Sequence, residues 1–185
     1  MQSNSTGTTL PIGILTVSDR VVRGEYEDLS GPLIEQTLSN YFFDDLEYIR
    51  RTVADEKPQI EEKLRHLCDD CHCCVVFTTG GTGPAPRDVT PEATIAVCDK
   101  LLPGYGEAMR SVSRERGVVT AILSRQQAGI RNRSIIINLP GSTRAVEECL
   151  QVVLPSLAHC VSLLQGESIL HPFSTNGTQP FIHPV

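Results

Sequence analysis

Apolar runs and amphipathic stretches alternate along this chain. The runs that predict β-strands are rich in aliphatic residues and lie at residues 11–17, 46–53, 73–77 and 134–138. Between them, apolar side chains recur at helical spacing, as at Ile60, Leu64 and Leu67. The helical stretches begin near residues 30, 55, 90, 105 and 142. This alternation predicts an α/β fold with three layers, α/β/α, around a mostly parallel, doubly wound sheet.

Residues that favour the N-cap position stand at most of the predicted helix starts. Ser30, Asp55, Thr90 and Ser142 each precede an apolar helical pattern, and Thr90 is followed directly by a proline. A side-chain oxygen at the N-cap accepts a hydrogen bond from a free amide of the first turn, and proline is favoured just after it. We therefore predict that these side chains cap helices.

A single domain accounts for most of the chain. The length of 185 residues suits one domain, and the alternating elements run from residue 11 to about residue 166. Residues 1–10 are expected to form a flexible N-terminus. Beyond Gly166 the apolar periodicity ends, and Pro172, Pro180 and Pro184 interrupt the sequence. We predict an irregular C-terminal tail over residues 167–185 that is dispensable for chemistry.

The composition argues against two classes of partner. The net charge of −6 is unsuited to a broad nucleic-acid surface, because such surfaces need many Lys and Arg contacts with phosphate. No run approaches the ~20 apolar residues of a membrane span, and the N-terminus lacks a basic segment before an apolar core. We expect a soluble, cytoplasmic protein that binds neither nucleic acid nor membrane.

The segment 78–88, Thr-Thr-Gly-Gly-Thr-Gly-Pro-Ala-Pro-Arg-Asp, carries the strongest chemical signal. It follows an apolar strand candidate and precedes the helix start at Thr90. Glycines let the backbone turn and bring free N–H groups close to an anion, and a helix N-terminus adds a favourable dipole. The segment is therefore predicted to be a phosphate-binding loop, and the turn from Asn138 to Ser142 forms a second strand, turn and helix unit.

Aspartates stand near the ends of the predicted strands. If those strands are parallel, the loops that contain Asp19, Asp55 and Asp88 meet at one edge of the sheet. A carboxylate beside a phosphate is repulsive unless a cation lies between them, so the set suggests Mg²⁺. Each residue also has a structural explanation, because Asp55 could cap a helix, Asp88 could favour a helix dipole and Asp19 could be a turn residue. Arg87 and Arg125 are either surface charges or phosphate ligands.

The cysteines need a separate interpretation, because Cys68, Cys71, Cys73 and Cys74 cluster around His72. The spacing from Cys68 to Cys71 suits a pair of zinc ligands, but the second half of a structural zinc site is missing. Cys73 and Cys74 would also point to opposite faces of a strand. We therefore favour small buried side chains in a reducing compartment over a metal site.

The chain resembles the molybdopterin adenylyltransferases, the family of bacterial MogA and of the G domain of gephyrin. The resemblance extends from about residue 11 to residue 166, and the long motif over residues 78–94 is its most specific part. It implies a MogA-like domain that transfers AMP from ATP to the terminal phosphate of molybdopterin and releases pyrophosphate. The other matching segments are residues 14–19, 28–31, 55–56, 121–125, 129–131 and 136–142.

The resemblance also implies residue roles and partners. Asp55 and Asp88 match the family's essential acidic pair, so they are the expected catalytic residues and Mg²⁺ ligands, with ATP and molybdopterin as substrates. Family members form homotrimers, and the apolar last helix supplies surface for such an assembly. The product could pass to a molybdenum-insertion protein. The expected substrate- and nucleotide-binding residues are Ser18, Asp19, Thr79, Gly80, Gly81, Thr82, Gly83, Arg87, Ser124, Arg125, Asn138, Pro140, Gly141 and Ser142.

Three functions remain open at the level of sequence. The first is the adenylyltransferase, the second is a non-catalytic molybdopterin-binding relative, and the third is a gephyrin-like scaffold. The presence of both Asp55 and Asp88 favours catalysis over the inactive binder. A chain without a visible second domain makes the scaffold the weakest of the three.

Overall fold

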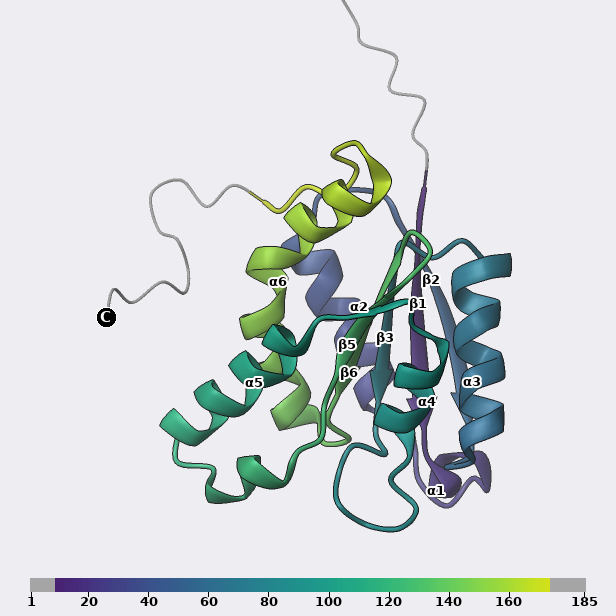
Figure 1. Ribbon diagram of the computed structural model, residues 1–185, viewed down its shortest axis with the longest axis vertical. Coiled ribbons are helices and arrows are strands. Elements are labelled where there is room, and N and C mark those ends of the chain that lie inside the picture. Colours follow the sequence, from purple (N-terminus) through teal and green to yellow (C-terminus); the bar gives the residue numbers. More distant parts are fainter. Residues whose placement is uncertain (1–8, 174–185) are drawn as a thin grey trace, which may run out of the picture.

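The computed structural model describes residues 9–173, which contain one six-stranded sheet with helices on both faces (Figure 1). The strands lie in the order β2-β1-β3-β6-β5-β4, and the neighbours among β2, β1, β3 and β6 are parallel. The predicted α/β fold with a mostly parallel, doubly wound sheet is therefore confirmed. The strands are β1 (Leu10–Val17), β2 (Leu46–Val53), β3 (Val75–Thr79), β4 (Lys100–Leu101), β5 (Ala128–Arg131) and β6 (Ser134–Leu139).

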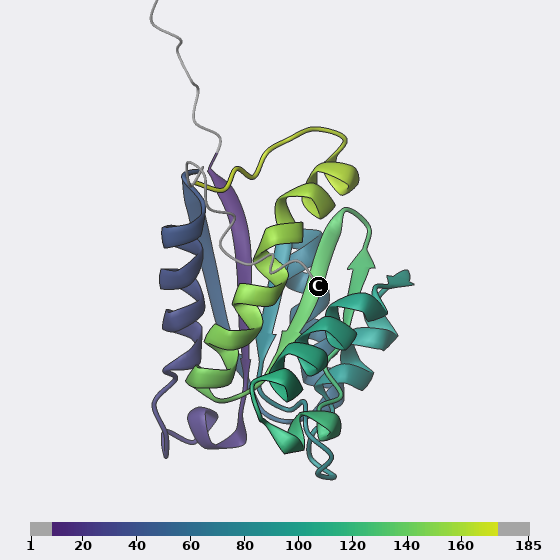
Figure 2. The ribbon, with the colours of Figure 1, turned by 90° about the vertical axis from the view of Figure 1, so that its left-hand side faces the viewer.

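The helices form the two outer layers (Figure 2). The core on one face of the sheet contains apolar side chains of α2, α5 and α6, and the core on the other face contains those of α3 and α4. The helices are α1 (Asp19–Val22), α2 (Ser30–Tyr41), α3 (Lys57–Arg65), α4 (Thr90–Val97), α5 (Pro103–Glu115) and α6 (Thr143–Gln165), with a π-helical turn η1 (His66–Asp70) and a 3₁₀ turn η2 (Val119–Leu123).

The central strands are apolar because both of their faces are covered. Every residue of β3 and β6 is buried, as expected for parallel strands between two helical layers. In the register of the sheet, Ile14 lies beside Phe77, which lies beside Ile137. The edge strand β2 is more polar, and only its last residue, Val53, is buried. The carboxyl ends of these strands thus rest on a rigid apolar sheet.

The other edge of the sheet is antiparallel, and the sequence pattern did not predict it. The helix expected over residues 90–101 ends at Val97, and β4 then pairs with β5, which pairs antiparallel with β6. A strand of two residues is too short to show any periodicity. Pro103 begins α5 instead of separating two helices, since proline is well tolerated in a first helical turn.

Helix α6 is long and apolar enough, by length and composition alone, to cross a membrane, which differs from the sequence-based expectation. Its apolar side chains nevertheless lie in the core against the sheet. Val153, Leu157 and Val161 are buried within the chain itself, whereas Val152 and Leu164 are only partly buried and Leu163 is exposed. Packing inside this domain therefore explains much, but not all, of the apolar surface of α6.

Residues 167–173 contain no helix or strand, yet they pack against the folded unit. Leu170 is buried in the core, and Pro172 forms a β-bridge with Phe42. The backbone N–H of His171 donates to Asp44 Oδ2 at 2.5 Å, and its ring stacks on Phe43. Residues 167–173 therefore close one end of the sheet, whereas residues 1–8 and 174–185 lie outside the described part.

Three of the four predicted helix caps are wrong. Ser142 does cap α6, because its hydroxyl accepts the N–H of Ala145 at 3.4 Å. In contrast, Ser30, Asp55 and Thr90 have other hydrogen-bond partners, and α2, α3 and α4 begin without a side-chain cap at the preceding residue. The side-chain oxygens of these residues bond to neighbouring loops, at Gly141, Asp19 and Gly80. The preference of a residue type for the N-cap position does not predict such contacts.

Candidate active site

The carboxyl ends of β1, β2, β3 and β6 meet at one edge of the sheet, the lower edge in Figure 1. The chain leaves β1 toward β2 on one side and returns to β3 on the other, so β1 and β3 flank a topological switch point. Ligands bind beside such points in doubly wound folds. The expected loops at this edge are those after β1, β2, β3 and β6.

The glycine loop that follows β3 has the close contacts that glycine allows. Gly80 has φ +96°, and a Cβ built on it would lie 2.3 Å from the carbonyl oxygen of Val17. Gly81 has φ +62°, and its Cβ would lie 2.4 Å from Thr90 Oγ1. Within residues 9–173 the amides of Gly81, Thr82 and Gly83 donate no hydrogen bond. Free amides of this kind are what the predicted phosphate site requires.

Thr90 and Arg125 hold the loop in this shape. The hydroxyl of Thr90 donates to Gly80 O at 2.9 Å, and the backbone N–H of Arg125 donates to Thr82 O at 2.9 Å. The Arg125 side chain donates to Gly83 O at 2.8 Å, and also to Asp88 O and to the carboxylate of Glu92. The Nε, Nη1 and Nη2 atoms of Arg125 thus each donate to a group of the protein, and Arg125 positions the glycine loop.

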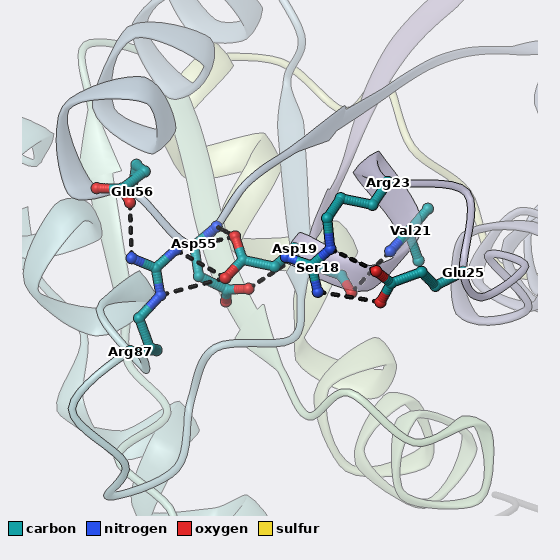
Figure 3. Close-up of polar contacts among 8 residues, drawn as sticks. All are labelled: Ser18, Asp19, Val21, Arg23, Glu25, Asp55, Glu56 and Arg87. Carbon is teal, nitrogen blue, oxygen red and sulfur yellow. Dashed lines mark hydrogen bonds and ion pairs between the residues drawn. The ribbon is translucent and has the colours of Figure 1, made fainter.

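Asp19 and Asp55 bind each other's backbone (Figure 3). The N–H of Asp19 donates to Asp55 Oδ2 at 2.8 Å, and the N–H of Asp55 donates to Asp19 Oδ1 at 3.0 Å. The amide of Asp55, together with the guanidinium of Arg87, lowers the pKa of Asp19. Burial raises the pKa of Asp55, although the bond from the Asp19 amide opposes this effect. The reciprocal bonds join the loops after β1 and β2.

Arg87 lies across these two loops (Figure 3). Its guanidinium donates to Asp19 Oδ2 at 2.7 Å and to Glu56 Oε1 at 2.6 Å, and its side chain remains 55% exposed. In this arrangement the guanidinium of Arg87 pairs with two carboxylates of the protein. Because both ion pairs are exposed, Arg87 is still accessible to an incoming anion.

Asp88 lies beside the glycine loop. Its Oδ2 accepts the N–H of Ala85 at 2.9 Å, and a Cβ built on Gly83 would lie 2.8 Å from the same oxygen. Within residues 9–173, Oδ1 of Asp88 and Oδ1 of Asp55 accept no hydrogen bond from the protein. The same residues include no group of three or more side chains that could hold a metal ion alone. Two carboxylate oxygens fit Mg²⁺, which commonly takes one or two carboxylates and completes its shell with water and substrate phosphate.

A pocket lies on each side of the glycine loop. The polar pocket has a volume of about 250 Å³, and the residues that line it include Ser18, Asp28, Ser30, Asp55, Thr79, Gly80, Gly81 and Gly141. The apolar pocket has a volume of about 320 Å³, and the residues that line it are Thr82, Gly83, Pro84, Arg110, Ser113, Val118, Thr120, Ala121, Leu123, Ser124, Gln126, Pro140, Ala145, Glu148 and Cys149. The loop thus lies between the two pockets. Gly81 lines the polar pocket, and Thr82 and Gly83 line the apolar pocket.

Sequence reasoning did not assign Asp28 a role in the site. Its Oδ2 accepts the hydroxyl of Thr16 at 2.7 Å, and its Oδ1 accepts the N–H of Gly31 at 2.9 Å. The side chain of Asp28 therefore satisfies the start of α2, the role predicted for Ser30, whose hydroxyl instead donates to Gly141 O at 3.1 Å. An aspartate three residues before a glycine at a helix start was the signal available in the sequence.

Two predicted ligand contacts are interior residues. Asn138 is fully buried, and its Nδ2 donates to Thr78 Oγ1 at 2.9 Å and to Thr94 Oγ1 at 2.8 Å. Thr79 is 1% exposed, and its hydroxyl donates to Pro140 O at 2.7 Å. Both side chains therefore bond to the protein and support the strands and the turn after β6, although Thr79 also lines the polar pocket.

The cysteine cluster lies at the opposite end of β3 from the site. Cys68, Cys73 and Cys74 are buried, and burial raises the pKa of these thiols to about 12, 12 and 11. Residues 9–173 offer no metal-binding group of three or more side chains here. The structure agrees with the interpretation of these residues as apolar core.

The fold and the site together define a class, the α/β proteins with a glycine loop and neighbouring carboxylates at the switch point of a doubly wound sheet. The chain belongs to the family described as "Probable molybdopterin binding domain", whose model matches residues 13–159. It is 54% identical to a molybdopterin adenylyltransferase of Helicobacter pylori over 85% of this chain and 89% of the relative. It is 42% identical to the Escherichia coli enzyme of the same name, over 85% and 87% of the two chains. The crystal structure of the molybdopterin biosynthesis enzyme MoaB from Thermus thermophilus has a TM-score of 0.79 and 42% identity, covering 86% of this chain and 98% of MoaB.

Proposed function

We propose that the protein catalyses the transfer of AMP from ATP to the terminal phosphate of molybdopterin, giving adenylylated molybdopterin and pyrophosphate. The observation that carries this proposal is the position of free loop amides beside the carboxylates of Asp55 and Asp88. The relatives that are named molybdopterin adenylyltransferase support the catalytic function over a purely binding or scaffolding one.

The chemistry requires alignment of two anions more than it requires a reactive side chain. Each substrate fills one pocket, so the phosphates of both meet at Gly81, Thr82 and Gly83, where amide donors stabilise charge that develops on the reacting phosphate. Asp55 and Asp88 would hold Mg²⁺, which when bound neutralises the phosphates. No covalent enzyme intermediate is needed, because the terminal phosphate of molybdopterin is itself the nucleophile.

Three further features belong to the same proposal. The protein works in the cytoplasm, forms a homotrimer, and passes its product to a molybdenum-insertion protein. A trimer is supported by apolar side chains that remain on the surface of the last helix, such as Leu163, which is 71% exposed. Light scattering at micromolar concentration that finds a 20 kDa particle would contradict the trimer.

The test of the reaction is direct. Purified protein is incubated with molybdopterin and Mg-ATP, and the products are identified by mass spectrometry. We expect adenylylated molybdopterin and pyrophosphate, with no product in excess EDTA. Binding of molybdopterin without any turnover would identify the protein as a non-catalytic relative.

A further inference from the structure

A buried amide stands in the apolar pocket, and its hydrogen bonds are unusual. Gln126 is 3% exposed and lines this pocket. Its Oε1 accepts the hydroxyl of Ser124 at 2.5 Å. Its Nε2 donates to two sulfur atoms, Cys149 Sγ at 3.5 Å and Met109 Sδ at 3.6 Å. Sulfur is a weak acceptor, so these bonds replace the hydration of the amide poorly.

The position of Gln126 is fixed by close backbone packing. The guanidinium of Arg110 donates to the carbonyl oxygen of Gln126 at 3.1 Å. A Cβ built on Gly106 in α5 would lie 2.4 Å from the same oxygen, so only glycine allows α5 to approach this closely. The amide is therefore oriented before any ligand arrives, which lowers the entropic cost of binding.

We propose that Gln126 recognises a fused nitrogen heterocycle in the apolar pocket by donating from Nε2 to an acceptor of the ring. The inference rests on the proposed function, in which the purine of ATP and the pterin of molybdopterin are both such rings. Apolar side chains, among them Val118 and Leu123, contact the faces of the ring, and the buried, oriented amide of Gln126 sets its direction. The amide exchanges a weak bond with sulfur for a stronger bond with a ring nitrogen or carbonyl oxygen.

The geometry of the pocket fits this role. Thr82 and Gly83 line the same pocket as Gln126, so a heterocycle held here carries its phosphate toward the free amides of the loop. Ser124 was expected to lie near a substrate, and the structure gives it the role of fixing the Oε1 end of Gln126. Ser124 is therefore a positioning residue, and Gln126 is the residue that discriminates.

The test replaces Gln126 by methionine, which keeps the length of the side chain and packs against Cys149 and Met109 but donates no hydrogen bond. Steady-state KM values are measured with ATP and with molybdopterin varied separately. We expect KM for one substrate to rise about tenfold or more, and KM for the other to stay within about twofold. The substrate whose KM rises is the one whose ring occupies the apolar pocket.

Equilibrium binding separates this inference from the proposed function. Calorimetry with molybdopterin, and with an ATP analogue that cannot be cleaved between its α and β phosphates, does not require turnover. If the wild type binds both but produces nothing, the proposed function fails, whereas selective weakening of one ligand by Gln126→Met still supports the inference.

A second variant, Gln126→Glu, keeps the acceptor that faces Ser124, replaces the donor by an oxygen and adds a negative charge, so the same or a larger selective loss is expected. Thermal unfolding of both variants provides the control. Unchanged affinity for both ligands in a folded variant would overturn the inference. Equal weakening of both ligands with a lower unfolding temperature would also overturn it, because Gln126 would then be purely structural.

Discussion

The two pockets beside the glycine loop differ in the groups that they present. The polar pocket contains Asp55, whose pKa is raised by burial, and Asp28, whose carboxylate is fully used in holding the chain. The apolar pocket contains one buried amide, Gln126, between apolar side chains such as Val118 and Leu123, and Arg110 and Glu148 also line it. The loop between them exposes amides to both sides. We infer that the polar pocket supplies charge for the reaction and that the apolar pocket supplies recognition.

This difference leads to distinct expectations for substitutions on the two sides. Changes in the polar pocket should lower kcat, because they remove groups that act on the reacting phosphates. Changes in the apolar pocket should raise KM for one substrate. Changes away from both pockets should alter stability alone.

The largest expected effect is at the two carboxylates beside the glycine loop, Asp55 in the polar pocket and Asp88 next to Gly83. Asp55→Asn and Asp88→Asn keep the oxygens that accept the N–H groups of Asp19 and Ala85 but lose the charge that would hold Mg²⁺. We expect both variants to stay folded and to lose about a hundredfold or more in kcat, on the order of 3 kcal/mol. The measurement is turnover at saturating Mg-ATP and molybdopterin.

Asp45→Asn is the matched control for these variants. Asp45 is exposed near the amino end of β1, where it accepts the hydroxyl of Thr9 at 3.2 Å. Its substitution should leave kcat unchanged. Near-normal turnover in both Asp55→Asn and Asp88→Asn would remove the assigned difference between the pockets.

The next effect concerns the loop that separates the pockets. In Gly80→Ala the new methyl group would lie 2.3 Å from the carbonyl oxygen of Val17, so the loop must shift away from β1. We expect a loss of about 2–4 kcal/mol in the free energy of unfolding, because backbone strain adds to a steric clash. Denaturant titration measures it.

Gly24→Ala isolates the strain from the clash, since Gly24 also has positive φ, +70°, but nothing lies within 4 Å of its Cβ. Its cost should be about 1 kcal/mol. Equal costs at the two positions would show that contact with β1 does not fix the loop.

A smaller effect is expected at the end of the sheet that is remote from both pockets. Truncation after Gly166 removes Leu170, which is 2% exposed, and should cost about 2 kcal/mol of stability from lost burial. Truncation after Phe173 is the control and retains these contacts. Both truncated proteins should keep the KM values of the full chain. A selective rise in KM after truncation at Gly166 would mean that this end of the molecule contributes to a pocket.

The smallest effect is expected at Arg87, which bridges Asp19 and Glu56 on the exposed rim of the polar pocket. Arg87→Ala should leave the unfolding temperature nearly unchanged, since exposed ion pairs contribute little to stability. If Arg87 exchanges these carboxylates for a phosphate during turnover, KM for ATP rises about tenfold or less. Arg23→Ala is the control, because Arg23 forms a similar exposed pair with Glu25. Identical KM values for both variants would leave Arg87 with a purely local role.

The sequence could predict those elements in which several consecutive residues follow one hydrophobic pattern. The runs that became β1, β3 and β6 are apolar, β2 is a longer and more polar run, and their shared edge follows from the parallel sheet. The two-residue strand β4 and the short β5 were missed, because Gly129 and Arg131 hide the alternation of β5. Their pairing depends on β6, which is distant from β4 in sequence.

The sequence predicted which residues lie near the site more accurately than it predicted their hydrogen-bond partners. Asp19, Asp55 and the glycine loop lie together as expected, yet Arg125, Asn138 and Thr79 spend their polar groups on the protein. The sequence identifies which residues lie at the carboxyl edge of the sheet. The hydrogen-bond partner of each residue depends on the exact shape of short turns, which the sequence pattern does not specify. For the same reason Asp28 holds the start of α2 in place of Ser30.

The reciprocal hydrogen bonds between Asp19 and Asp55 constrain how this sequence can evolve. Replacement of either residue by one without a side-chain oxygen leaves the amide of the other residue without its acceptor and weakens the link between the loops after β1 and β2. A lineage that replaces one aspartate therefore passes through an impaired intermediate before a second change can compensate. Positions 19 and 55 should be inherited as a pair, whereas the exposed Glu56 and Arg87 are free to drift more independently. Protein engineers who diversify this edge would accordingly vary positions 19 and 55 together in one library.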